Sequence, residues 1–389
     1  MYAAKMVNPA ASENVGNSSI ELSYRYGPLI LRAFMRLLHC LALPLLLACS
    51  APTTAPQLPT LPQARSVAEF SANLEQLRTA LKIPAFSAAI TRGTSVVWSK
   101  GFGMADVEAR VPATPETEYH LASLTKTYAS TVLLQLVDEG KVSLDDPVSK
   151  YGIVLASSGV IRVRHLMSHT SEGEPGARYA YNGNRFSLLD SVIVRASGHT
   201  FAQQVAERIL VPLHAQRTAP NPLAPTSFAV MGFDQSQFVA RMAKPYAVSN
   251  DEIVPSSYPT SFSTAAGMVS TALEMARYSI AMDTNAFLRP ATKALAWTPT
   301  IATNGDTLPY GLGWFTTRVS GVPIVWHYGY WTANSSLIVK VPSRGLSFVI
   351  MANSDMLSRP TRLGAGDLMS SSLAREFLNT FVFGTATLP

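Results

Sequence analysis

The first regular pattern of apolar residues lies at 67–81, where they recur at steps of three and four. This spacing predicts an amphipathic helix that ends near Pro84. Two runs rich in β-forming residues follow at 86–90 and 95–99, and the segment 91–94 between them is typical of a tight turn. The pattern therefore predicts a helix followed by a β-hairpin.

The next part of the chain has a helical pattern. It runs from 123 to 137, closes at Asp138-Glu139-Gly140, and is followed by helical or irregular stretches to about residue 282. The sequence shows no internal repeat. We therefore expect the middle of the chain to be mostly α-helical.

The C-terminal part is rich in β-forming residues again. Four runs predict successive antiparallel strands, at 310–317, 324–327, 335–341 and 346–352, with turns at Gly321 and 342–345. Apolar residues at helical spacing predict a closing helix, namely Leu368, Leu373, Phe377 and Phe381.

These elements predict one α/β domain at 66–385 that is built from both ends of the chain. An antiparallel sheet flanked by helices is expected from 66–115 and 300–385, with a helical insertion at 116–299.

The residues before this domain have a different composition. Arg32 and Arg36 precede an apolar stretch at 37–48, which is shorter than the roughly 20 residues that span a bilayer but suits a signal peptide. Cys49 follows directly, and Leu46-Leu47-Ala48-Cys49 resembles a bacterial lipobox. The resemblance implies export to the periplasm and membrane anchoring through lipidated Cys49. A chance apolar stretch that packs as a short helix is the alternative.

Residues 1–49 are accordingly interpreted as an N-terminal extension and signal peptide. Glu13 and Glu21 are unusual in the charged region of a signal, so Met35 is the expected translational start rather than Met1. The Ala-, Pro- and Thr-rich segment 50–65 is expected to be an extended linker.

Composition narrows the class of protein. Hydrophobic residues make up 47% of the 389 residues and charged residues 14%, as in a globular domain. The net charge of +6 is scattered without a basic run, which argues against nucleic-acid binding. The two cysteines, Cys40 and Cys49, precede the domain, so no internal disulfide is expected in it.

A Ser-x-x-Lys motif at Ser123 and Lys126 is the first candidate for chemistry. It stands where a helix is predicted to begin, and a spacing of three brings the amine beside the hydroxyl. A buried lysine with a lowered pKa can activate a serine for nucleophilic attack. Considered alone, the motif is more often a helix cap followed by a solvated lysine.

The surrounding segments resemble class C β-lactamase-related serine hydrolases, a group that includes carboxylesterases and D-alanyl-D-alanine carboxypeptidases. The similarity spans roughly 66–385 and rests on ordered matches at 101–106, 123–126, 142–148, 164–171, 265–271, 310–314 and 327–329. It implies a β-lactamase/transpeptidase-like fold with an all-helical subdomain, and Ser123 as nucleophile beside Lys126. It implies no metal and no cofactor.

The second box of this family, Tyr-x-Asn, precedes a Leu-Leu pair. Counting back from Leu188 assigns Tyr181 as the general base, with Tyr179 as the competing candidate. The third position is Gly183 instead of Asn. Tyr181 could otherwise be a packing residue.

The third box corresponds to His327-Tyr328-Gly329, where many relatives have Lys-Thr-Gly. The resemblance implies that His327 acts at the site and that the backbone N–H groups of Ser123 and Tyr330 form the oxyanion hole. Gly329 is expected to let substrate approach the strand.

Other chemistries have weaker support. His165 and His169 are four residues apart, as in a helical zinc pair, but the glutamate of His-Glu-x-x-His is missing. Gly101-x-Gly103 lacks the third glycine of a dinucleotide-binding turn and is expected to be a turn at a strand end. The sequence also has no Gly-x-Ser-x-Gly elbow.

The two departures from the family bear on the substrate. A histidine is expected to be neutral near pH 7 and to anchor a carboxylate less strongly than lysine does. Gly183 removes an amide that would contact an acylamide side chain. Both favour small esters, so a carboxylesterase is the leading expectation. The alternatives are a β-lactamase or D-alanyl-D-alanine carboxypeptidase and, in another class, a non-catalytic envelope binding protein.

Overall fold

The computed structural model describes residues 58–389. The predictions about the signal peptide, the start at Met35 and lipidation of Cys49 concern residues outside this range. Among the helices of the described part, none combines the length and the hydropathy needed to cross a membrane.

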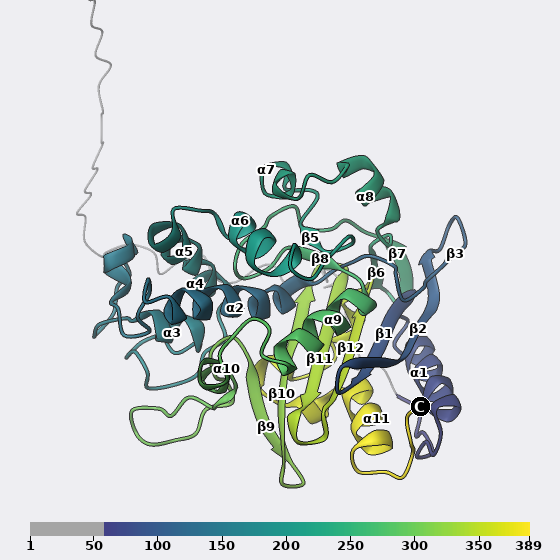
Figure 1. Ribbon diagram of the computed structural model, residues 1–389. Helices are drawn as coiled ribbons and strands as arrows, with labels where there is room; N and C mark the ends of the chain where they lie inside the picture. Colours follow the sequence, from purple (N-terminus) through teal and green to yellow (C-terminus); the bar gives the residue numbers. More distant parts are fainter. Residues whose placement is uncertain (1–57) are drawn as a thin grey trace, which may run out of the picture. The chain divides into compact units, whose positions relative to one another are not determined.

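A seven-stranded antiparallel sheet forms the centre of the domain, in the order β3-β2-β1-β12-β11-β10-β9 (Figure 1). The strands are β1 (Ala85–Arg92), β2 (Ser95–Asp106), β3 (Val111–Pro112), β9 (Phe315–Val319), β10 (Val322–Trp331), β11 (Asn334–Val341) and β12 (Leu346–Ala352). The N-terminal strand β1 pairs with the C-terminal strand β12. The prediction that both chain ends build one sheet is therefore confirmed.

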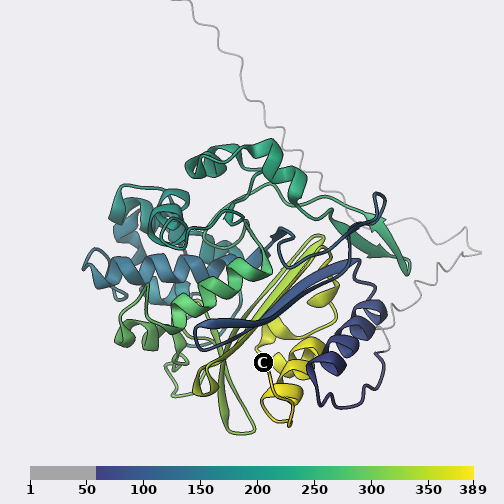
Figure 2. The same ribbon diagram turned by 45° about the vertical axis from the view of Figure 1, so that its right-hand side comes forward.

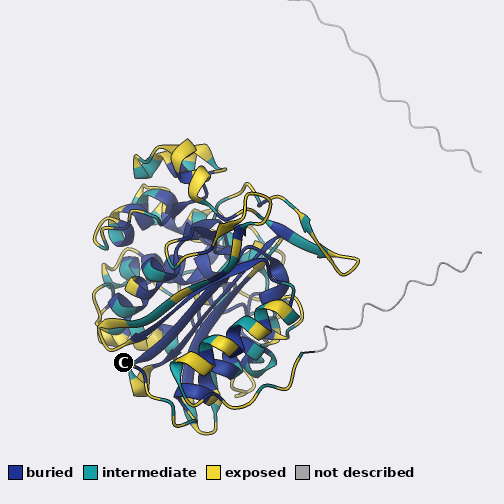
Figure 3. Cartoon of the chain, turned by 90° about the vertical axis from the view of Figure 1, so that its right-hand side faces the viewer, coloured by how far each residue is buried: buried dark blue, intermediate teal, exposed yellow. Residues whose placement is uncertain are grey.

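Helices cover both faces of this sheet, because alternate residues of a strand point to opposite sides. Helices α1 (Val67–Ala80) and α11 (Ser372–Phe381) contact each other on one face (Figure 2). There Phe70 and Phe381 pack edge to face, with ring centroids 4.9 Å apart. On the other face α9 (Ala272–Asp283) contacts β1 and β12. Strands β1, β11 and β12 and most of β10 are consequently buried between helices whose outer sides are exposed, whereas β2 and β3 at one edge are largely exposed or half-buried (Figure 3).

Helices form most of the regular structure in the middle of the chain, as predicted, and irregular stretches separate them. Besides α9, the helices here are α2 (Thr125–Asp138), α3 (Val163–Met167), α4 (Gly183–Ser187), α5 (Leu189–Ser197), α6 (Phe201–Val205), α7 (Pro225–Phe228), α8 (Gln235–Arg241) and α10 (Pro290–Trp297). The region is not all-helical, however. It also contains a small sheet of β4 (Tyr119–His120), β8 (Met268–Ser270) and β5 (Ala219–Pro220), and a hairpin of β6 (Tyr246–Ser249) and β7 (Glu252–Pro255).

Two local predictions were wrong. Gly101 and Gly103 lie inside β2 instead of in a turn at its end. A Cβ at Gly101 would lie 2.1 Å from the carbonyl oxygen of Ala113, so glycine is needed there for close approach of the neighbouring chain. The run at 310–317 becomes a strand only from Phe315 onwards, because the preceding residues pack against α2, where Ser130 donates a hydrogen bond to the carbonyl of Leu312.

Candidate active site

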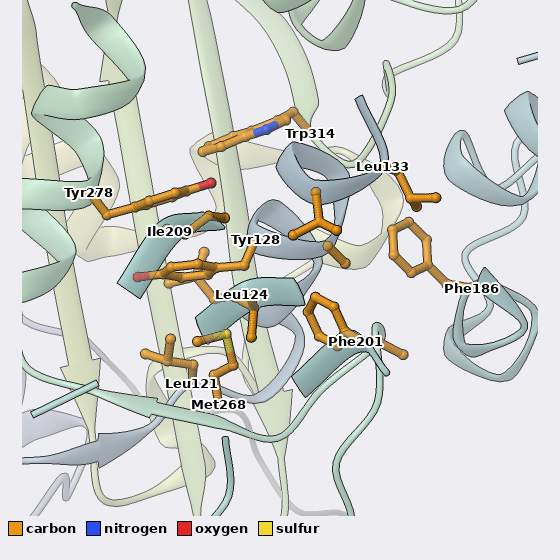
Figure 4. Close-up of a cluster of buried hydrophobic side chains, with 14 of the residues drawn as sticks. Leu121, Leu124, Tyr128, Leu133, Phe186, Phe201, Ile209, Met268, Tyr278 and Trp314 are labelled. Carbon is orange, nitrogen blue, oxygen red and sulfur yellow. The ribbon is translucent and has the colours of Figure 1, made fainter. Parts of the chain in front are cut away.

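Ser123 lies in a 3-10 turn, Ala122–Leu124, that leads directly into α2. Leu121 and Leu124 on either side are fully buried and point into a hydrophobic cluster (Figure 4). Ser123 itself is partly exposed. The core thus holds the flanking residues and leaves the serine hydroxyl accessible.

Lys126 is in the first turn of α2, and its Nζ lies 3.0 Å from the Oγ of Ser123. The same amine donates to the carbonyl of Ala265 at 2.8 Å. Lys126 is 0% exposed, and no carboxylate of the described residues forms an ion pair with it. Burial therefore lowers the pKa of Lys126 to about 7, because the charged form of the amine loses its contact with water and gains no carboxylate partner.

The residue before Ser123 has an unfavourable backbone conformation. Ala122 has φ +48°, in the left-handed region that residues with a Cβ rarely occupy. Such a residue costs about 1–3 kcal/mol and persists only where its surroundings hold it in place. Backbone strain is thus located directly beside the reactive hydroxyl.

The structure separates the two candidate tyrosines. The ring of Tyr181 lies 5.0 Å below the amine of Lys126. Its hydroxyl is buried and has no hydrogen-bond partner within 58–389. Burial raises the pKa of this phenol well above its usual value, and nearby Ser123 lowers the pKa by a smaller amount. Tyr179, in contrast, donates its hydroxyl hydrogen bond to the carbonyl of Gly364 at 3.0 Å. Tyr181 is the tyrosine beside Ser123 and Lys126.

Gly183 begins α4, and a Cβ there would lie 4.0 Å from the amine of Lys126. A side chain at this position would therefore reach the site. Its neighbour Asn182 does not replace the missing amide, because it caps α4 and donates to Glu172 at 2.6 Å.

His327 on β10 is completely buried, and both of its ring nitrogens have partners. Nδ1 lies 2.7 Å from the carbonyl of Tyr328, and Nε2 lies 2.8 Å from the hydroxyl of Tyr310. Since a carbonyl only accepts, Nδ1 carries the hydrogen and Nε2 accepts from Tyr310. Burial and the nearby Lys126 lower the pKa of His327 well below its usual value. The expected neutral histidine is present, but it has no free ring nitrogen for a substrate.

Gly329 also has a different environment from the one expected. A Cβ there would lie 2.2 Å from the carbonyl oxygen of Leu121 and 2.3 Å from the hydroxyl of Ser336. The space beside Gly329 is therefore filled by the turn that precedes Ser123. Tyr330, the next residue along β10, is 48% exposed.

Sequence reasoning missed two groups at this site, the carbonyl of Ala265 and the hydroxyl of Tyr310. It considered His169 only as a metal ligand, whereas the ring centroid of His169 lies 4.2 Å from that of Tyr181. All three residues fall in segments that carry the family resemblance, but nothing in the sequence indicates what they contact.

The histidine pair does not have the geometry of a zinc site. His165 lies within α3, whereas His169 lies beyond its end with φ +55°. Nδ1 of each ring accepts a backbone N–H, from Arg162 at 3.1 Å and from Asn182 at 3.2 Å respectively. Residues 58–389 contain no cluster of three or more potential metal ligands among His, Cys, Asp and Glu.

The sheet, the helical region and the Ser-Lys pair where they meet define a serine hydrolase of the β-lactamase fold. The sequence profile of the Beta-lactamase family matches residues 70–365, and the chain belongs to this family.

Relatives and solved structures agree with this assignment. Protein flp of Staphylococcus aureus (strain MW2) is 23% identical over 314 residues, which cover 70% of this chain but only 60% of flp. The octameric penicillin-binding protein homologue from Pyrococcus abyssi has a TM-score of 0.69 at 23% identity and covers 81% of this chain and 78% of its own. EstCE1, a hydrolase with promiscuous acyltransferase activity, has a TM-score of 0.62 at 20% identity, covering 80% and 96%. At these identities the structural likeness concerns the fold alone.

Proposed function

We propose that this protein is a carboxylesterase that hydrolyses small uncharged esters through an acyl-enzyme on Ser123. The observation that carries the proposal is the buried amine of Lys126, 3.0 Å from the serine hydroxyl and with its pKa lowered to about 7. An amine that is partly unprotonated at neutral pH can accept the serine proton.

In the acylation step the Oγ of Ser123 attacks the ester carbonyl carbon, and its proton passes to Lys126. The bond to the alcohol oxygen then breaks, and the departing alkoxide takes this proton from Lys126 and leaves as the alcohol. Water attacks the acyl-enzyme and gives a proton to the neutral amine of Lys126, which returns it to the Oγ of Ser123 as the acid leaves. Tyr181, whose pKa is raised far above neutral, is assigned to relay the proton as a neutral phenol instead of acting as the base.

The geometry of β10 supports an oxyanion hole formed by the N–H groups of Ser123 and Tyr330. Strand β10 pairs with β9 only as far as Trp326, so the later residues have no strand of the described sheet on that side. Trp331 and Asn334 close a two-residue turn to β11. Because N–H groups alternate in an antiparallel pair, the N–H of Tyr330 points to the open edge. The turn containing Ser123 contacts this strand.

The preference for uncharged esters rests on the missing cation. His327 is buried and neutral and hydrogen-bonded at both nitrogens, so the third box offers no charge to the carboxylate of a β-lactam or peptide. Gly183 offers no amide beside Lys126. The second candidate, β-lactam or D-alanyl-peptide hydrolysis, is favoured by the Ser-Lys-Tyr arrangement itself, which suits any acyl transfer.

The test is hydrolysis of p-nitrophenyl butyrate and of a chromogenic cephalosporin by the purified protein and its Ser123→Ala variant. We expect ester turnover that falls about a thousandfold or more in the variant, and little cephalosporin cleavage. Dominant cephalosporin cleavage would make the second candidate correct. Absence of both activities and of labelling by a serine-reactive probe would instead support the binding-protein alternative.

We further propose that the protein is exported and anchored to a membrane through Cys49. The proposal is supported by the two arginines, the apolar stretch at 37–48 and the cysteine that follows it.

A further inference from the structure

The peptide groups before Ser123 are held from several sides. Leu121 donates its N–H to the carbonyl of Met268 at 2.8 Å, and the carbonyl of Ala122 accepts from the hydroxyl of Thr125 at 2.8 Å. Two further contacts come from side chains that the proposed mechanism does not use, those of Ser336 and His120. Both contacts act on the strained junction of Leu121 and Ala122.

Ser336 reaches this junction from β11. Its hydroxyl, 0% exposed with its residue, donates to the carbonyl of Leu121 at 2.7 Å. It does so across the position where Gly329 lacks a side chain, since a Cβ there would lie 2.3 Å from the same hydroxyl. The sheet thus approaches the turn closely enough to hold one of its carbonyls through a side chain.

His120 reaches the junction from the other side. Its Nδ1 lies 3.0 Å from the N–H of Ala122, the residue with positive φ. The ring is fully buried between Tyr258, with which it stacks at a centroid distance of 5.9 Å, and Trp331, which contacts it edge-on at 5.9 Å. The imidazole is therefore fixed in place by two aromatic neighbours.

One competing contact affects the role of His120. The Oδ1 of Asn334 lies 3.1 Å from the same Nδ1. One nitrogen cannot accept from Ala122 and donate to Asn334 at the same time, so the tautomer decides which bond forms. The Nε2–H tautomer lets Nδ1 accept from the backbone of Ala122.

We propose that Ser336 and His120 are positioning residues, which hold the Leu121–Ala122 junction in its strained conformation and thereby aim the hydroxyl and the N–H of Ser123. The inference rests on the proposed role of Ser123 as nucleophile. Neither Ser336 nor His120 touches the substrate or the reacting atoms, so both act through the position of Ser123 and affect the rate of acylation.

The first experiment compares Ser336→Ala with Ser335→Ala. Ser335 is the matched control, because it is also 0% exposed and donates its hydroxyl to a backbone carbonyl, that of Ser354, instead of to the turn before Ser123. The readout is the rate of labelling by a fluorophosphonate probe, alongside thermal unfolding. The probe reports attack by the Oγ of Ser123 on phosphorus with loss of fluoride, whatever the natural substrate is, so a failure of the esterase proposal is distinguishable from a failure of this one.

We expect Ser336→Ala to label about 10- to 100-fold more slowly than Ser335→Ala, although both lose one buried hydrogen bond. In ester assays the loss should appear in kcat with little change in KM. Equal labelling rates for the two variants would overturn the role of Ser336.

His120 gives a second test that does not depend on the folding of the Ser336 variant. His120→Phe keeps an aromatic ring between Tyr258 and Trp331 but removes the acceptor, so it should label about 10-fold or more slowly. His120→Asn restores an acceptor at the position of Nδ1 and should recover part of the rate. A loss in Asn334→Ala as large as that in His120→Phe would show that Nδ1 serves Asn334 and would overturn the role of His120.

Discussion

At the residue scale, the chemistry depends on how burial shifts the protonation of Lys126. Water is excluded from its amine and no carboxylate of the described residues pairs with it, so the neutral form becomes accessible near pH 7. Lys126 can therefore act as a base in the range where an ordinary lysine is fully protonated.

This shift predicts the pH dependence of acylation. Below about pH 7 the amine is protonated and cannot accept the proton of Ser123, so kcat/KM for a neutral ester should fall about tenfold per pH unit. Above pH 7 the profile should level off. The measurement is kcat/KM for p-nitrophenyl butyrate from pH 5 to 9, corrected for spontaneous hydrolysis. A profile still rising steeply at pH 9 would contradict a base with this pKa.

The two tyrosines give a matched pair of variants. Tyr181→Phe should lower kcat by about 100-fold or more, because its hydroxyl is the one beside Ser123. Tyr179→Phe loses only the hydrogen bond to Gly364, so it should change stability slightly and leave kcat within about threefold. Steady-state kinetics and thermal unfolding of both variants measure this. The reverse ranking would move the tyrosine role to Tyr179.

At the element scale, activity depends on how closely β10 approaches the turn before α2. Gly329 allows this approach, since any Cβ would overlap the carbonyl of Leu121 and the hydroxyl of Ser336. The strand therefore supports the turn as well as providing the edge on which Tyr330 lies.

This close approach predicts that Gly329→Ala loses most of its activity, because the added methyl group must displace the turn that presents Ser123. Gly159→Ala is the control, since the nearest atom to its Cβ would be at an ordinary 3.5 Å. Probe labelling and circular dichroism should show a folded but slowly labelled Gly329→Ala protein. Labelling of this variant at the rate of the control would contradict the contact.

At the scale of the whole molecule, the prediction concerns the segment before the enzyme domain. In a Gram-negative bacterial host, the full-length chain should be found in the membrane fraction, whereas Cys49→Ala should lose the lipid and become extractable without detergent. Fractionation and metabolic labelling with a fatty acid analogue measure this. Incorporation of label into Cys49→Ala would contradict lipidation at this cysteine.

Features that depend on local spacing could be predicted from the sequence. Ser123 and Lys126 are three residues apart at a helix start, so the helical geometry alone brings them together. The β-rich runs at 324–327, 335–341 and 346–352 and the helix at 67–81 are predicted from periodicity in the same way, and the structure confirms them. The closing helix is also present, but it begins only at Ser372. The ordered motifs then indicated the family, which the comparisons confirm.

Contacts between distant segments could not be predicted from local spacing and became visible only in the folded chain. The tertiary structure placed Tyr181 instead of Tyr179 beside Lys126, enclosed His327 between Tyr310 and the carbonyl of Tyr328, and filled the space beside Gly329 with the chain itself. Periodicity shows which face of an element is buried, but not which groups meet across two elements. Burial, hydrogen bonding and the resulting pKa shifts depend on contacts between elements, so they follow only from the packing of the sheet against the helical region.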